Sequence, residues 1–152
     1  LGERMHNAFE QLFNEGCEKA IIIGSDLPTI DSEVIGEAFT ALNTDDVILG
    51  PSEDGGFYLI GLSYAHKELF SDIEWDSSDV YHSTLNVVKK LGINLYELKL
   101  RNDIDNIEDL QKLIDSIGRM SRTSKSNIPN TIGFLDSLDL HPGKIDKVGD
   151  KK

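Results

Sequence analysis

Apolar residues recur at helical spacing in four stretches of the chain, residues 1–15, 31–42, 79–90 and 106–117. Within each stretch the apolar positions form one stripe and the remaining positions are mostly polar, which is typical of a helix that packs one face against a core. Acidic residues stand near the starts of the second and fourth stretches, where the helix dipole favours negative charge. The pattern therefore predicts four amphipathic helices.

Short apolar runs between the helices predict four strands, at residues 20–24, 46–50, 57–62 and 93–100. The three isoleucines at 21–23 show no polar alternation, which predicts a strand covered on both faces. A helix joins the first two strands, so we expect them to run parallel in one sheet. Only six residues separate the second strand from the third, too few for a parallel crossover, so the third should run antiparallel. Gly61 interrupts the third strand and predicts a bulge.

The regular pattern ends at Gly118. Residues 119–130 are rich in Ser, Thr, Arg and Lys, and after them only residues 132–140 contain enough apolar side chains to pack, as one weak element. We therefore predict one α/β domain over residues 1–117, followed over residues 118–152 by either an appended segment or a disordered polar tail.

The chain of 152 residues is acidic, with a formal net charge of −12, and the surplus of carboxylates lies ahead of residue 118. Such a surface repels a phosphate backbone, which argues against nucleic acid as a partner. No apolar run approaches the length of a membrane span, so we expect no membrane partner. The single Cys17 excludes an internal disulfide and fits a cytoplasmic protein.

Asp26 follows the first predicted strand in the motif GSDLP. An open α/β sheet binds its ligands outside the carboxyl ends of its strands, so Asp26 is a candidate ligand of a bound group. Pro28 stops the strand and holds the loop that carries Asp26. Capping of the next helix explains Asp26 equally well.

The loop PSEDGG, residues 51–56, connects the second and third strands and should emerge near Asp26. Gly55 and Gly56 permit positive φ and a close approach of the backbone to a ligand. A plain acidic turn is the alternative, because Asp-Gly is a strong turn signal. Two glycines beside two carboxylates are more than a turn needs, so we favour a functional loop.

Asp103 and Asp105 stand two residues apart in the motif NDIDNIEDL, so in an extended chain they share one face. Two carboxylates on one face repel each other unless a cation lies between them or one binds a proton. A site for a divalent cation, with Asp26 as a third oxygen donor, is one interpretation. Capping of the last helix by Asp105 or Asn106 is the other, and both can hold.

Trp75 lies in an irregular stretch with polar neighbours. It suits either a lid over a substrate or an apolar plug under the sheet, of which the plug is the safer interpretation. His66 and His82 are isolated, and neither has a visible catalytic partner in the sequence.

The segments GSDLP, VILGPSEDGGFYLIGL, Phe70 to Ser77 and NDIDNIEDL, in this order and spacing, resemble a bacterial branch of the nucleotide-diphospho-sugar transferase superfamily. The resemblance covers roughly residues 1–117. It implies the GT-A fold, a three-layer α/β/α architecture with a mixed, mostly parallel sheet. This branch is usually catalogued as an uncharacterised or arsenosugar-biosynthesis-like glycosyltransferase. Neighbouring branches are nucleotidyltransferases that act on molybdopterin or phospholactate.

The resemblance implies roles for particular residues. Asp26 and one or both of Asp103 and Asp105 would bind Mg²⁺ or Mn²⁺, and Asp54 would contact the substrate. A catalytic role is the alternative for Asp54, which could orient or deprotonate an acceptor hydroxyl. The resemblance also implies substrate contacts by Gly55 and Gly56, and the loop positions of Pro28 and Trp75 make them further candidate substrate contacts. The closing motif departs from the family pattern, because Asn106 and Ile107 replace Thr and Pro.

The family also begins with a strand and a glycine-rich basic loop, and nothing at Leu1 resembles them. We therefore expect the chain to correspond to a GT-A domain truncated at its N-terminus, with an exposed sheet edge that promotes self-association.

The expected function is metal-dependent transfer from a nucleotide-linked donor to a small-molecule acceptor, most simply glycosyl transfer from a nucleotide-sugar. Two alternatives remain at this point. The chain could transfer a nucleotidyl group from a nucleoside triphosphate to a small phosphorylated acceptor, or it could be an inactive remnant that only binds a partner.

Overall fold

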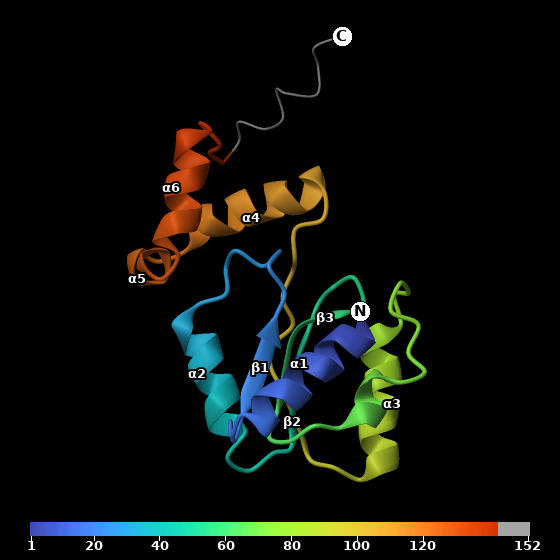
Figure 1. Cartoon of the computed structure of the whole chain (residues 1–152). Helices are drawn as coiled ribbons and strands as arrows, with labels where there is room; N and C mark the ends of the chain where they lie inside the picture. Colours follow the sequence, from blue (N-terminus) through green and yellow to red (C-terminus); the bar gives the residue numbers. More distant parts are fainter. Residues whose placement is uncertain (143–152) are drawn as a thin grey trace. The chain divides into compact units, whose positions relative to one another are not determined.

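The computed structural model describes residues 1–142, and these residues form two compact units (Figure 1). The sheet unit consists of Leu1–Gly24 and Glu33–Asn102, and the helical unit consists of Ser25–Ser32 and the residues from Asp103 onward. No helix within residues 1–142 combines the length and the apolar character that crossing a bilayer requires.

The sheet unit is built on a mixed sheet whose strands lie in the order β1-β3-β2-β4. Strand β3 runs antiparallel to both of its neighbours, and β4 runs parallel to β2, so β1, β2 and β4 share one direction. The predicted parallel relation of the first two strands and the antiparallel third strand are confirmed. The strands are β1 Ala20–Ile23, β2 Val47–Pro51, β3 Phe57–Leu62 and β4 Leu95–Glu97.

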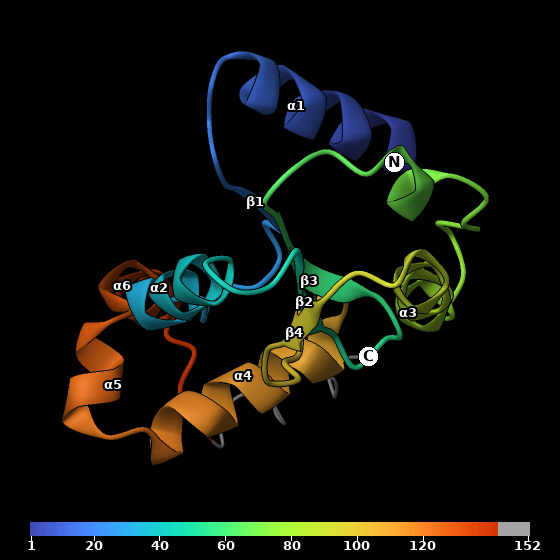
Figure 2. The ribbon, with the colours of Figure 1, turned by 90° about the horizontal axis from the view of Figure 1, so that it is seen from below.

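Helices cover both faces of this sheet, and Figure 2 shows α2 on one side and α3 on the other. The helical elements of the unit are α1 Gly2–Asn14, α2 Ser32–Ala41, the short 3-10 helix η1 Lys67–Phe70 and α3 Val80–Leu91. Side chains of α1, η1 and α3 pack with alternate residues of the central strands into one core. Its buried members are Met5, Phe9, Ala20, Val47, Leu49, Ile60, Leu62, Leu69, Phe70 and Val88.

Strand β1 is less covered than the sequence predicts. It lies at an edge of the sheet, with β3 as its only neighbour among the described strands. Ile23 is therefore 43% exposed, and the prediction of a strand covered on both faces is wrong at this residue. An exposed edge of this kind is a condition for the self-association expected above, which stays a prediction.

Gly61 does not form the predicted bulge. It pairs in regular register with Ile21 on one side and Ile48 on the other, and the only register shift between β2 and β3 falls at Gly50 and Pro51. A Cβ at Gly61 would lie 2.8 Å from the Ile21 side chain and 3.3 Å from those of Ile48 and Leu42. The glycine therefore serves close packing on the sheet face that α2 covers.

Strand β4 is shorter than the predicted run of residues 93–100. Its ladder with β2 covers Leu95–Glu97, and hydrogen bonds continue irregularly beyond it, from Leu98 N–H to the Leu49 carbonyl at 2.8 Å and from Arg101 N–H to the Pro51 carbonyl at 3.1 Å. Beyond the ladder Leu98 is buried but Leu100 is 58% exposed, so the alternating sequence pattern extends further than the strand itself.

The helical unit contains α4 Ile107–Arg119, α5 Arg122–Ser126 and α6 Pro129–Ser137. Leu113 and Ile114 of α4 pack with Leu135 of α6 into a small core. Regular structure thus continues beyond the predicted boundary at residue 117, because a few apolar residues with helical spacing suffice for a small core. The final part of the predicted tail, residues 143–152, lies outside the described residues.

His66 is the buried titratable residue with the clearest consequence for stability. It is 7% exposed, its ring lies against that of Tyr64, and its Nε2 atom has no hydrogen-bond partner among the described residues. Burial lowers the pKa of His66 below its ordinary value of 6.5, against the opposing charges of Glu68 and Asp46. We therefore expect the free energy of unfolding to fall as the pH drops below about 6.5, since the unfolded state then binds the proton more readily.

Urea unfolding measured between pH 5 and pH 8 tests this expectation. His66→Phe removes the titrating group and should flatten the dependence below pH 6.5, whereas His82→Gln, at an exposed histidine, should leave it unchanged. If the free energy of unfolding depends on pH in the same way in the His66→Phe variant and the original chain, other groups cause the loss of stability at low pH.

Candidate functional site

The loop between β2 and β3 is a tight turn held by backbone hydrogen bonds. Ser52 N–H donates to the Gly56 carbonyl at 3.1 Å, and Gly55 N–H donates to the Ser52 carbonyl at 3.2 Å. At its outer side the Gly55 carbonyl accepts from Tyr81 N–H, near the start of α3, at 2.9 Å. The loop is therefore attached to the helix as well as to the sheet.

Gly55 is required at its position for two separate reasons. Its φ of +92° lies in the region that side chains disfavour, and a Cβ there would lie 1.9 Å from the Ser78 carbonyl oxygen. From its sequence context this glycine is expected to let a ligand approach the backbone closely. In the structure the close neighbour is the chain itself.

Asp54 stands exposed on this loop with a fixed carboxylate. Its Oδ1 accepts a hydrogen bond from Gly56 N–H at 2.9 Å and a second, short one from the Ser52 hydroxyl. A Cβ at Gly56 would lie 3.2 Å from that oxygen and 3.3 Å from the Ser52 hydroxyl, so the second glycine leaves room for this arrangement. Asp54 is thus held in one direction before any ligand arrives.

A pocket of about 580 Å³ opens in the sheet unit beside the loop. Glu53 and Gly55 line it together with Tyr81 and His82 of α3 and Glu97 of β4. The Tyr81 hydroxyl donates a short hydrogen bond to Glu97. Burial, and then this bond and the charge of Glu97, raise the pKa of Tyr81 well above its ordinary value.

Sequence reasoning missed Tyr81 and Glu97 as members of a site. They are 16 residues apart, one on a helix and one on a strand, and no local sequence pattern reveals that these two elements are in contact. The only sequence feature that pointed to a site here was the polar side chain of Glu97 within an alternating strand. Exposure of that side chain to solvent explains this feature equally well.

The predicted metal ligands belong to the helical unit. Ile104 N–H donates to the Asp26 carbonyl at 3.0 Å, which joins the backbone of the GSDLP loop to the segment that carries Asp103 and Asp105. Carboxylate oxygens of Asp103 and Asp105 lie within 4.8 Å of each other. The expected sharing of one face by these two carboxylates is therefore found.

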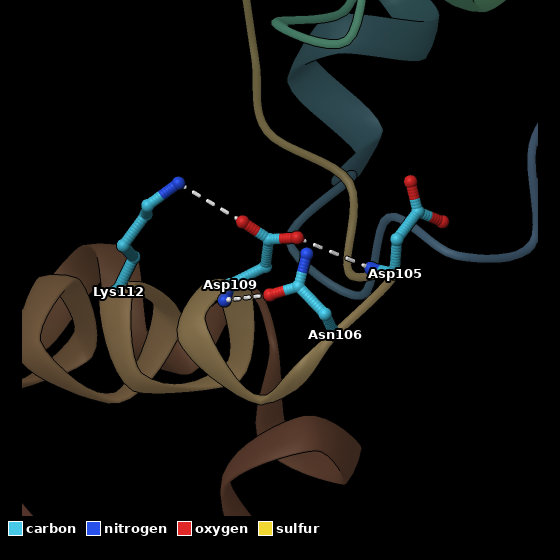
Figure 3. A network of polar contacts seen from close by, with 4 residues as sticks. All are labelled: Asp105, Asn106, Asp109 and Lys112. Atoms are coloured by element: carbon cyan, nitrogen blue, oxygen red, sulfur yellow. Dashed lines mark hydrogen bonds and ion pairs between the residues drawn. The ribbon is translucent and has the colours of Figure 1, made fainter.

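The structure shows which residue caps the start of α4. Asn106 is the N-cap, and its side-chain oxygen accepts from Asp109 N–H at 3.0 Å (Figure 3). Asp105 contributes only its backbone N–H, which donates to Asp109 Oδ2 at 3.4 Å, and its carboxylate points away from this network. A hydrogen bond from Lys112 at 2.9 Å lowers the pKa of Asp109. The carboxylate of Asp105 is thus left out of the cap.

Two of the predicted substrate contacts have structural partners. The Pro28 carbonyl accepts from the Thr131 hydroxyl at 2.7 Å within the helical unit. The Trp75 ring packs edge-on against Phe57 at 6.1 Å and is stacked with Phe70 at 6.4 Å between centroids. Trp75 therefore fills the packing role that the sequence favoured, and contact of either residue with a substrate stays a prediction.

The sheet order, the single antiparallel strand and the helices on both faces define an α/β protein with the fold of nucleotide-diphospho-sugar transferases, as the sequence motifs predict. The model of a family described as uncharacterized proteins conserved in bacteria (DUF2064) matches residues 1–77, and the chain belongs to this family.

One similar solved structure carries a functional assignment. It is the crystal structure of a protein from Desulfovibrio desulfuricans G20 that is provisionally assigned as a nucleotide-diphospho-sugar transferase. The two chains are 31% identical and superpose with a TM-score of 0.79 over 91% of the present chain. The present chain spans 60% of the length of that protein. Among proteins with curated functions, no match was found.

Proposed function

We propose that this chain belongs to a transferase that uses a nucleotide-linked donor, and that the reaction is glycosyl transfer from a nucleotide-sugar with the help of a divalent cation. The observation that carries the proposal is the pair of carboxylates of Asp103 and Asp105, on a segment whose Ile104 N–H donates to the backbone carbonyl of Asp26. The likeness to the Desulfovibrio protein supports the class of donor.

The residues present suit Mg²⁺ or Mn²⁺, which prefer carboxylate oxygens. Two carboxylate oxygens within 4.8 Å of each other repel, and a cation between them removes that cost. Asp105 is exposed and takes no part in the helix cap through its side chain, and Asp26 is exposed as well. We therefore assign the cation to Asp103 and Asp105, with Asp26 as the third oxygen donor.

Asp54 is proposed to act on the acceptor. Its Oδ1 is occupied by two hydrogen bonds, whereas for Oδ2 no partner is recorded within residues 1–142, so this oxygen is available to orient an acceptor hydroxyl or to accept its proton. Gly55 and Gly56 keep the backbone around Asp54 free of side chains, and Pro28 and Trp75 are the further proposed substrate contacts. A bound Mg²⁺ or Mn²⁺ would neutralise the charge that develops on the leaving phosphate.

A thermal-shift experiment with Mn²⁺ tests this proposal. At a Mn²⁺ concentration tenfold above Kd, binding adds about 1.4 kcal/mol to the free energy of unfolding. For a chain of 152 residues this corresponds to a rise in Tm of roughly 3–6 °C. Asp105→Asn should abolish most of the rise. Glu108→Gln is the matched control, because it removes one exposed negative charge three residues away and should leave the rise intact.

The same assay identifies the donor when Mn²⁺ is combined with UDP-glucose, GDP-mannose or GTP. A further rise with a nucleotide-sugar supports glycosyl transfer, whereas a rise with GTP alone would replace it by nucleotidyl transfer. Equal shifts by Mn²⁺ in the Asp105→Asn and Glu108→Gln variants would show that the cation binds the acidic surface in general and would overturn the assigned site.

A further inference from the structure

Ser52 is the one polar side chain of the β2–β3 loop that is buried, with 5% of its surface exposed. Its hydroxyl donates to Oδ1 of Asp54, the same oxygen that accepts from Gly56 N–H. We infer that Ser52 is a positioning residue that fixes the direction of the Asp54 carboxylate. The inference deepens the proposed function and rests on it for the role of Asp54.

The hydroxyl of Ser52 is well placed because three interactions hold the backbone of this residue. Its N–H and its carbonyl close the turn with Gly56 and Gly55, and the residue forms a parallel bridge with Arg101. Arg101 in turn bonds through its N–H to the Pro51 carbonyl and accepts from Glu53 N–H at 3.2 Å. The Ser52 side chain therefore starts from an anchored point of the sheet edge.

Two donors on one carboxylate oxygen have a chemical consequence. A side chain on an exposed loop would otherwise rotate about two torsions, and a substrate would have to order it on binding. Because Oδ1 accepts from Gly56 N–H and from the Ser52 hydroxyl, the side chain is already ordered before a substrate binds. Oδ2 then remains for the ligand. Residues that act on a substrate work best when such a second layer fixes their rotamer.

A purely structural role for Ser52 in the turn makes a different prediction. The bonds that close the turn use the backbone of Ser52, so they survive loss of the hydroxyl. If the hydroxyl only stabilised the turn, its removal would loosen every amide of the loop. If it positions Asp54, removal should affect the one amide that donates to the Asp54 side chain, which is that of Gly56.

Amide hydrogen exchange measured by NMR separates these roles without any metal or donor. Ser52→Thr keeps the hydroxyl and adds a methyl group, Ser52→Val has nearly the same shape as Thr with a methyl group in place of the hydroxyl, and Ser52→Ala removes the hydroxyl without adding volume. We expect the protection of the Gly56 amide to fall about tenfold in the Val and Ala variants, as loss of a hydrogen bond to a charged group implies. The Thr variant should retain protection, and the Gly55 amide, which donates to a backbone carbonyl, should stay protected in all three.

Equal loss in the Thr and Val variants, or joint loss at Gly55 and Gly56, would overturn the positioning role. Asp54→Ala serves as the reference, because it removes the acceptor itself and should lower the Gly56 protection as Ser52→Val does. Failure of the donor screen would leave this result standing. Donor binding together with an unchanged Gly56 amide would refute only the role of Ser52.

Once a donor is identified, steady-state kinetics give a second test. Ser52→Val should lower kcat by roughly 10-fold or more with KM unchanged, and Ser52→Thr should retain the original kcat.

Discussion

Gly55→Ala is expected to lower the free energy of unfolding by about 2–4 kcal/mol, because it combines backbone strain with a collision. The φ of +92° disfavours any side chain, and the new Cβ would lie 1.9 Å from the Ser78 carbonyl oxygen. That oxygen belongs to the backbone two residues before α3 and cannot move aside as a flexible side chain could. The loop must therefore detach from α3 and lose the hydrogen bond from Tyr81 N–H to the Gly55 carbonyl.

Gly16→Ala is the matched control for this variant. Gly16 has the same φ of +92°, and a Cβ there meets nothing within 4 Å. Its cost should be that of backbone strain alone, about 1 kcal/mol. Urea unfolding of both variants measures the difference, which isolates the contact between the loop and α3. Equal costs would mean that the loop is not seated against Ser78.

Phe9→Ala is expected to lower the free energy of unfolding by about 3–5 kcal/mol. Phe9 is fully buried, and its ring lies 5.9 Å from that of Phe70 and 6.1 Å from that of Phe13 between centroids. Its removal leaves a cavity between α1, η1 and the sheet. The drop in Tm should reach roughly 10 °C or more.

Ala8→Ser, at the exposed neighbour of Phe9, should change Tm by little. Phe9→Leu should retain most of the stability because it keeps much of the buried volume. Calorimetric scans of the three variants measure these differences. A small effect of Phe9→Ala would contradict the assignment of α1 to the core of the sheet unit.

The strand directions were predictable because they depend on local features. The apolar run at Ile21 and Ile22 indicates a strand, and the crossover helix and the six-residue loop each restrict one connection to one direction. Coverage at the sheet edge was not predictable, since the exposure of Ile23 depends on which strand lies beside β1. Gly61 was misread for a similar reason, because a glycine required for packing under Leu42 and a glycine in a bulge look alike in sequence.

The carboxylate pair of Asp103 and Asp105 was predictable because residues two apart share a face of an extended chain. Asn106 was one of the two caps that the sequence left open. The contact of Ser52 with Asp54 was not anticipated, because it requires the tight turn that brings a hydroxyl back onto the chain two residues later. Tyr81 and Glu97 needed the tertiary arrangement of α3 and β4, which no spacing in the sequence contains.

Paramagnetic broadening by Mn²⁺ in an amide NMR spectrum tests the proposed cation site most directly. Mn²⁺ added well below one equivalent should broaden first the amide signals of Ile104, Asp105 and Leu27, which surround the assigned oxygens of Asp103, Asp105 and Asp26. The double variant Asp103→Asn with Asp105→Asn should lose this selective broadening, while Glu108→Gln keeps it. Broadening that begins elsewhere, or that spreads evenly over the acidic surface in all variants, would contradict the assignment of a metal site to these aspartates.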